Sequence, residues 1–353
     1  MAILGYNDVL QLPFGSLRTW NQIEATVSGS SGGQAVTGLP VTNIVDPSLG
    51  KVWRRNVTSL TPGGLTATII ARIETIPGWL RPSGYNINNI GLIGVLGLRT
   101  IVGSTDAGAE YDLQVRIKGS ATAFGGTDAF DQTRTFYANE FPGAWPRQVW
   151  FDNVPSATDP TAGGGVGAKA GRVPARYWQI EITVLQTPLS PYDLDVARVV
   201  FMNAFVAPYE PTPELAFEDA SEVVRSQGGQ PYALRKSAAR SVRGQFLRLT
   251  DREVFGYSEL EAGSSLSWGS TITAINKLSG NRGEVVLLPD LYSKATGTGG
   301  RLPSAWQTQP VFGRLDRGIT ARRVATTGGT PAPGQSTGAL WTADLSITET
   351  PLG

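Results

Sequence analysis

The chain has 353 residues, and its 30 basic and 29 acidic side chains leave a formal charge of +1. Histidine and cysteine are both missing from it, which excludes Ser-His-Asp triads, Cys-His pairs, disulfides and zinc sites built on thiolates or imidazoles. The balanced charge gives no general attraction for nucleic acid or an anionic membrane. Enzymes built on carboxylates, Lys, Tyr or Ser stay open, but we expect a structural or binding protein that is not an enzyme and needs no cofactor or metal.

The length and the pattern of turns indicate an all-β protein with two domains. A chain of 353 residues exceeds one ordinary hydrophobic core. Its 43 glycines and 23 prolines separate short runs of β-branched and aromatic residues, as in β-sandwiches. No window approaches the roughly 20 apolar residues of a membrane-spanning helix. The first residues also lack the pattern of a secretory signal, so we expect no membrane insertion and a product that stays in the cell that makes it.

Four runs predict strands, in chain order. Residues 111–118 and 178–184 alternate apolar and polar side chains, which is typical of half-buried strands. Residues 194–208 are mostly apolar and predict one long central strand. Residues 341–347 alternate again. These strands extend over both halves of the chain, so we expect a β-sandwich in each half.

A proline-rich segment predicts the domain boundary. Pro208, Pro211 and Pro213 fall within six residues, which favours an extended, semi-rigid connector. We therefore expect a first sandwich over residues 1–208, a connector over 209–213 and a second β-rich domain over 214–353.

Helix signals are confined to the second domain. Thr250-Asp251-Arg252-Glu253 has the form of a capping box and follows a strand predicted over residues 242–249. A second short helix is predicted over residues 270–278, with Gly280 as its stop.

The candidate functional residues are basic, aromatic or acidic. A basic-aromatic stretch favours a protein–protein interface over nucleic acid, because arginine is enriched at interfaces and the total charge is near neutral. The candidate interface residues are Arg235, Arg240, Arg243, Phe246, Arg248 and Phe255. Trp79 and Tyr85 are flanked by loop-forming residues and are candidate glycan contacts. Asp112 and Glu181 form a conceivable glycosidase pair, although their alternation with apolar residues favours solvated strand faces.

The first half resembles a known class of phage proteins. Residues 40–47, Pro-Val-Thr-Asn-Ile-Val-Asp-Pro, followed by Lys-Val-Trp-Arg-Arg at 51–55, resemble the opening of the discoidin-like, or galactose-binding-like, β-sandwiches of tailed-bacteriophage structural proteins. Residues 177–182 resemble the penultimate strand of the same sandwich.

The second half is similar to distal-tail and baseplate proteins of phage tail tips. The similarity is carried by segments at residues 217–221, 228–232, 240–246, 249–253, 287–290 and 311–315. A short helix between strands, at residues 250–261, agrees with the ring-forming domain of distal-tail proteins, which is a β-sandwich with a helix.

The resemblance implies a structural protein of the virion tail tip, assembled in the host cytoplasm. The chain would form a homo-oligomeric ring that joins the tail tube to the host-recognition proteins. Its implied partners are copies of itself, tail tube and tail hub proteins, and receptor-binding proteins, with no nucleic acid. The alternative is a carbohydrate-binding accessory protein that recognises a cell-surface glycan. A carboxylate-based glycosidase is a third and more distant class.

Overall fold

The computed structural model confirms the all-β fold and divides the chain into two compact units. The first unit comprises Met1–Asn7, Phe205–Ser293 and Gln309–Pro351, and the second comprises Asp8–Ala204, Lys294–Thr308 and Leu352–Gly353. The residues that the structure describes are 2–8, 21–28, 34–46, 48–58, 64–71, 91–102, 111–120, 130–136, 147–152, 177–185, 191–210, 213–218, 222–225, 231–234, 239–255, 271–278, 283–288, 310–326 and 339–350.

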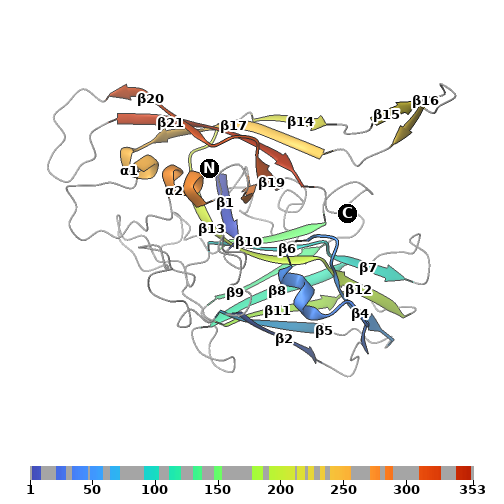
Figure 1. The fold of residues 1–353 in the computed structure, drawn as a ribbon. Helices are drawn as coiled ribbons and strands as arrows, with labels where there is room; N and C mark the ends of the chain where they lie inside the picture. The colour runs from blue at the N-terminus through green and yellow to red at the C-terminus, as the bar shows by residue number, and fades with distance from the viewer. Residues whose placement is uncertain are drawn as a thin grey trace. The chain divides into compact units, whose positions relative to one another are not determined.

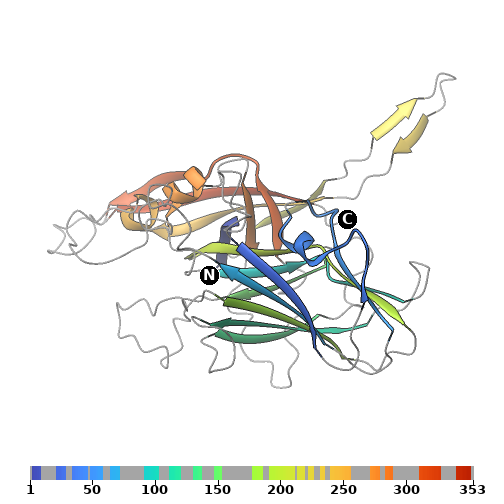
Figure 2. The same ribbon diagram turned by 60° about the horizontal axis from the view of Figure 1, so that its bottom comes forward.

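A five-stranded antiparallel sheet forms one layer of the second unit. Its strand order is β2-β5-β11-β8-β9, and β8 and β11 lie side by side in both views (Figure 1, Figure 2). The five strands are β2 (Asn21–Ser28), β5 (Gly64–Ala71), β8 (Leu113–Ser120), β9 (Phe130–Phe136) and β11 (Tyr177–Val184).

Two further groups of strands complete this unit. The order β3-β4-β12-β7 joins β3 (Gln34–Ala35), β4 (Trp53–Val57), β7 (Arg99–Val102) and β12 (Tyr192–Val196). The order β10-β6-β13 joins β6 (Leu92–Leu96), β10 (Gln148–Asp152) and β13 (Arg198–Ala207). A 3-10 helix, η3 (Val41–Val45), precedes β4.

Side chains from all these sheets meet in one core. On β8, Leu113, Val115 and Ile117 are buried and alternate with half-buried polar residues, as the sequence predicts. Trp178 of β11 is 1% exposed, and its ring lies 5.5 Å from that of Phe201 on β13. Strand period and aromatic packing across the layers therefore produce a sandwich.

The strands of the first unit are antiparallel and follow the order β1-β18-β19-β21-β17-β14, with β20 also paired to β21. Its strands are β1 (Ala2–Asp8), β14 (Glu214–Glu218), β17 (Ala239–Leu249), β18 (Glu284–Leu288), β19 (Val311–Leu315), β20 (Thr320–Thr326) and β21 (Ala339–Glu349). A hairpin of β15 (Glu222–Arg225) and β16 (Pro231–Leu234) forms its own two-stranded sheet.

Both predicted helices are present in the first unit, as α1 (Asp251–Phe255) and α2 (Ile272–Leu278). The capping box forms as expected: Glu253 Oε2 accepts hydrogen bonds from the backbone N of Thr250 at 2.8 Å and from its Oγ1 at 2.9 Å. Val254, Ile272 and Ile275 add to the core of this unit. Among the described helices, no span has the length and apolar character needed to cross a membrane.

The structure differs from the sequence prediction at the domain boundary. The division falls inside β13, between Ala204 and Phe205. Pro208–Glu210 is not a free connector: Leu247 N donates to Pro208 O at 2.8 Å, and Glu210 N donates to Gln245 O at 3.0 Å. The segment follows β17 because Tyr209 buries its ring in the first unit's core.

Two strands also depart from the predicted pattern. The run at 194–208 forms β12 and β13, separated at the buried Ala197, rather than one strand. Strand β1 belongs to the first unit and pairs with β18, although the sequence prediction assigned it to the N-terminal sandwich. Burial of Ala2, Leu4 and Tyr6 in the first unit's core accounts for that placement.

Candidate interaction surface

Arg240, a predicted interface residue, lies in the interior of the first unit. Its side chain is 5% exposed and pairs with Glu349, which is also 5% exposed. The guanidinium Nε donates to Glu349 Oε1 and Oε2 at 3.0 and 2.9 Å, and Nη2 donates to the carbonyl of Pro310 at 2.9 Å. An arginine whose hydrogen bonds are satisfied within the fold in this way does not present its charge to a partner.

Phe246 is likewise an interior residue, with an exposed fraction of 0%. Its ring packs edge-on against Phe205 and Tyr209, with centroid distances of 5.2 and 5.3 Å. The β17 alternation places Phe246 on the core face together with Val242.

The remaining predicted interface residues lie on the surface or outside the described residues. Arg243 and Arg248 are exposed on β17, and Arg248 has a φ of 55° beside the register shift in that strand. Phe255 is 40% exposed and contacts Trp341 edge-on at 5.1 Å. Arg235, Trp79 and Tyr85 lie outside the described residues.

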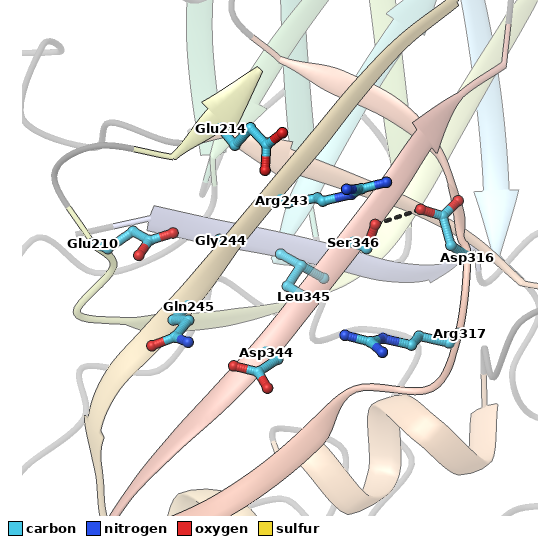
Figure 3. Close-up of a pocket in the computed structure, with 10 residues that line it drawn as sticks. All are labelled: Glu210, Glu214, Arg243, Gly244, Gln245, Asp316, Arg317, Asp344, Leu345 and Ser346. Atoms are coloured by element: carbon cyan, nitrogen blue, oxygen red, sulfur yellow. Dashed lines mark hydrogen bonds between the residues drawn. The ribbon is translucent and has the colours of Figure 1, made fainter. Parts of the chain in front are cut away.

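An open groove of about 630 Å³ lies over β17 and β21, beside the start of β14. Figure 3 shows Glu210 and Glu214 on one side of the two strands and Asp316 and Arg317 on the other. Ser346 donates a short hydrogen bond to Asp316 within it. The charged lining residues are Glu210, Glu214, Asp316, Asp344, Arg243 and Arg317, so acidic groups outnumber basic ones by four to two.

At Gly244, in the floor of the groove, the side chains of Tyr209 and Glu210 come very close to the backbone of β17. A Cβ atom at this position would lie 2.0 Å from Tyr209 Oη and 2.7 Å from Glu210 Oε1. Burial, and then the charge of Glu210, raise the pKa of Tyr209 well above the ordinary value of 10.0. The Tyr209 hydroxyl has no hydrogen-bond partner among the described residues. Glycine is therefore required here for a close approach of Tyr209 to the sheet.

Three exposed apolar side chains of the first unit were not predicted from the sequence. Leu215 and Phe217 of β14 are 50% and 60% exposed, and Val324 of β20 is 64% exposed. The alternation of Leu215 and Phe217 in Glu-Leu-Ala-Phe-Glu would ordinarily indicate a buried face. Their exposure marks a surface that is suited to a partner.

Both β14 and β20 are edge strands in the described part of the sheet, since each pairs with a single neighbour, β17 and β21 respectively. Figure 1 shows them at opposite ends of the sheet. Strand β14 pairs without any register shift. Strand β20 carries a shift between Arg323 and Ala325, and both Arg322 and Arg323 are exposed. Register shifts and exposed charges usually protect an edge strand from pairing with another chain. Among the described side chains of β14, the only exposed charge is Glu214.

Asn43, Asp46 and Arg54, which belong to the segments that resemble the phage sandwiches, make hydrogen bonds and ion pairs within the second unit. Asn43 Nδ2 donates to the carbonyl of Val52 at 2.8 Å, and Asp46 accepts from Lys51 Nζ at 3.0 Å. Arg54 pairs with Asp195 through Nε and Nη2, both at 2.6 Å. These polar groups bind partners within the chain, and the pair of Arg54 with Asp195 positions β4 against β12.

The geometry separates Asp112 from Glu181. Glu181 lies opposite Arg116, and Asp112 comes four residues earlier in the chain, about 13 Å along an extended strand. Glu181 instead accepts a hydrogen bond from Lys118 at 2.8 Å. Among the described residues, no group of three or more Asp or Glu is arranged to hold a metal ion.

Comparisons with known proteins leave the family open. No family model matches the chain, and no curated protein matches its sequence. A solved structure described as the structure of PfGH50B has a TM-score of 0.27 and 11% sequence identity. The match covers 51% of this chain and 22% of that chain. At this level of likeness, the match gives no indication of fold or activity.

Proposed function

We propose that this protein is a structural component of a bacteriophage tail tip or baseplate, and that it assembles with copies of itself through its first unit. The observation that carries the proposal is the position of β14 at the edge of the described sheet, where Leu215 and Phe217 are 50% and 60% exposed. Unpaired backbone groups beside exposed apolar side chains are an aggregation hazard in a monomer. An assembly that covers this edge removes the hazard.

The short helix that follows β17 in the first unit supports the same proposal. The first unit has the short helix α1 directly after β17, which is the arrangement expected from the resemblance to ring-forming distal-tail domains. We propose a scaffolding role without catalysis, because Glu181 is held in ion pairs by Lys118 and Arg116.

Electron microscopy of the purified full chain tests the proposal. We expect closed rings with a central lumen, and we expect an antibody against the chain to label one end of the tail on phage particles that contain it. Particles labelled on the capsid, or a chain that stays monomeric in micrographs at every concentration, would contradict the proposal. Release of reducing ends from cell-wall or capsule polysaccharide would replace it with an enzymatic function.

A further inference from the structure

We infer that Glu210 and Glu214, beside the β14 edge, bind a guanidinium group that the next copy brings to this edge. The inference rests on the self-assembly proposed above and names the chemistry that the covering partner supplies. A guanidinium group keeps its charge and carries several N–H donors in one fixed plane, so it can bridge two carboxylates.

The backbone places the two glutamates on either side of Gly244 along β17. Glu214 lies opposite Arg243 at the start of β14. On the other side, Glu210 N donates to Gln245 O at 3.0 Å. Figure 3 shows both glutamates on the same side of β17. Their backbone levels differ by two residues of that strand, about 7 Å, which is near enough for one planar group to donate to both carboxylates.

The two glutamates differ from the other acidic groups of the groove, because neither of their carboxylates has a hydrogen-bond or ion-pair partner among the described residues. Asp316 accepts hydrogen bonds from Ser346 and, at 2.6 Å, from Thr348 Oγ1. Asp344 lies 3.3 Å from Arg322. Two neighbouring charges without a counter-charge attract a cation and orient it.

The arginines of the groove do not neutralise this pair. No ion pair joins Arg243 to Glu214 in the described part of the chain, although the two residues are opposite each other. Figure 3 shows Arg243 directed towards Ser346, and Arg317 on the far side of β21. The β14 side of the groove is therefore the side on which a cation is missing.

A buried hydroxyl beside Glu210 also lacks a partner. Tyr209 is 9% exposed, and its Oη and Glu210 Oε1 both approach the position that a Cβ of Gly244 would take in the groove floor. The hydroxyl makes no hydrogen bond within the described residues, although buried polar groups almost always do. Rotation of the Glu210 side chain into the groove, a change that is common at interfaces, opens this oxygen to an N–H of the same guanidinium.

The neighbouring side chains are suited to an arginine that arrives on a protein segment. Leu215 and Phe217 follow Glu214 along β14 and are 50% and 60% exposed. Successive side chains of a strand point to opposite faces, so a segment that covers these two residues can present an arginine to Glu214 on the other face. Every copy carries exposed arginines without a described partner, such as Arg248 and Arg323.

Calorimetric titration of the full chain with an acetylated and amidated Val-Arg-Val tripeptide tests the inference, at concentrations below those at which the chain assembles. We expect saturable binding that weakens about tenfold in Glu210→Gln and in Glu214→Gln, because each variant loses a charge-assisted hydrogen bond. Tyr209→Phe should weaken binding by a smaller factor. The matched control, Asp316→Asn, removes a carboxylate that already has partners and should bind like the wild type.

Two further ligands separate the alternatives. Equal binding of a Val-Gln-Val tripeptide would show that the edge takes a strand without a site for charge. Displacement of the arginine peptide by calcium chloride at a lower concentration than the peptide would show a metal site instead. Either result overturns the inference, and so does the absence of binding by the arginine peptide.

Sedimentation of the variant Glu210→Gln with Glu214→Gln tests whether the next copy supplies the group. We expect this variant to need a protein concentration at least about tenfold higher than the wild type to form oligomers, whereas Asp316→Asn should assemble normally. If the wild type assembles and the double variant assembles equally well, the inference is wrong and the proposed function stands. If the wild type sediments as a monomer at all concentrations, the proposed self-assembly itself fails.

Discussion

The outer face of the five-stranded sheet in the second unit and the edges of the sheet in the first unit are two different kinds of β surface. On the first of these, Arg116 contacts Asp131 at 2.5 Å and Glu181 at 3.4 Å, so exposed charges pair with one another. On the second, Leu215 and Phe217 stand exposed beside unpaired backbone on the described edge of β14. Cross-strand charge pairs suit a face that stays in water, whereas an apolar open edge suits a partner.

The largest effect that we expect comes from the buried counterpart of these charge pairs, Arg240 with Glu349. Arg240→Ala leaves a carboxylate buried without its main partner and should lower the free energy of unfolding by about 3–5 kcal/mol. Urea denaturation followed by tryptophan fluorescence measures the loss. Replacing both residues together, as Arg240→Met with Glu349→Leu, should recover most of it. A loss as large in the double variant would show that the charges themselves stabilise the unit.

A second effect tests how tightly the first unit is packed beneath its groove. Gly244→Ala sets a methyl group 2.0 Å from Tyr209 Oη and 2.6 Å from Tyr209 Cζ, and such overpacking costs about 1–3 kcal/mol. Adding Tyr209→Phe removes the nearer atom and should restore part of the stability. Thermal denaturation of the wild type and the two variants measures this, and an unchanged melting temperature for Gly244→Ala would contradict the close approach.

Alkaline pH should weaken the core of the second unit through Tyr192. Burial raises the pKa of Tyr192 to about 12 from the ordinary value of 10.0. Between these two values the folded state holds its proton more tightly than the unfolded state, so stability falls as the pH rises. Urea denaturation at about pH 9 and about pH 11 should show a smaller decline in Tyr192→Phe than in the wild type. Equal declines would assign the alkaline sensitivity to other groups.

The smallest effect belongs to the exposed charge pairs of the second unit. Arg116→Ala should cost less than about 1 kcal/mol, and salt should reduce the cost further. Hydrogen bonds from Arg116 hold the pKa of Asp131 below its usual value of 3.8. The contribution of this pair is therefore present above that value and is lost as the pH falls through the lowered pKa. NMR titration should show the pKa of Asp131 rising in Arg116→Ala, with Arg116→Lys retaining part of the depression.

Local pattern was enough to predict the strands and helices whose signals lie within a few residues. The alternation around Leu113 and Trp178 repeats every two residues, and the capping box at Thr250 spans one helical turn, so both signals are local in the sequence. Contacts distant in the chain were not predictable in this way. Arg240 reads as a surface arginine because its partner, Glu349, is 109 residues away, and β1 pairs with β18 across most of the chain.

The candidate surface was the least predictable part. Leu215 and Phe217 have the spacing of a buried face, and only the position of β14 at the edge of the described sheet leaves them exposed. Conversely, Phe246 belongs to a basic-aromatic stretch that resembles an interface, but its ring completes a core cluster with Phe205 and Tyr209. Sequence identifies which residues are suited to burial, and the strand order determines what buries them.

Sedimentation velocity of the full chain over a range of concentrations tests most directly whether the open edge of β14 serves assembly. We expect the wild type to form oligomers and Phe217→Glu to remain monomeric, because a carboxylate at this position cannot be buried against the next copy without a partner. The matched control, Leu185→Glu, alters an exposed apolar residue of the second unit and should assemble like the wild type. Assembly of Phe217→Glu at wild-type concentrations, with its fold intact by circular dichroism, would contradict the account.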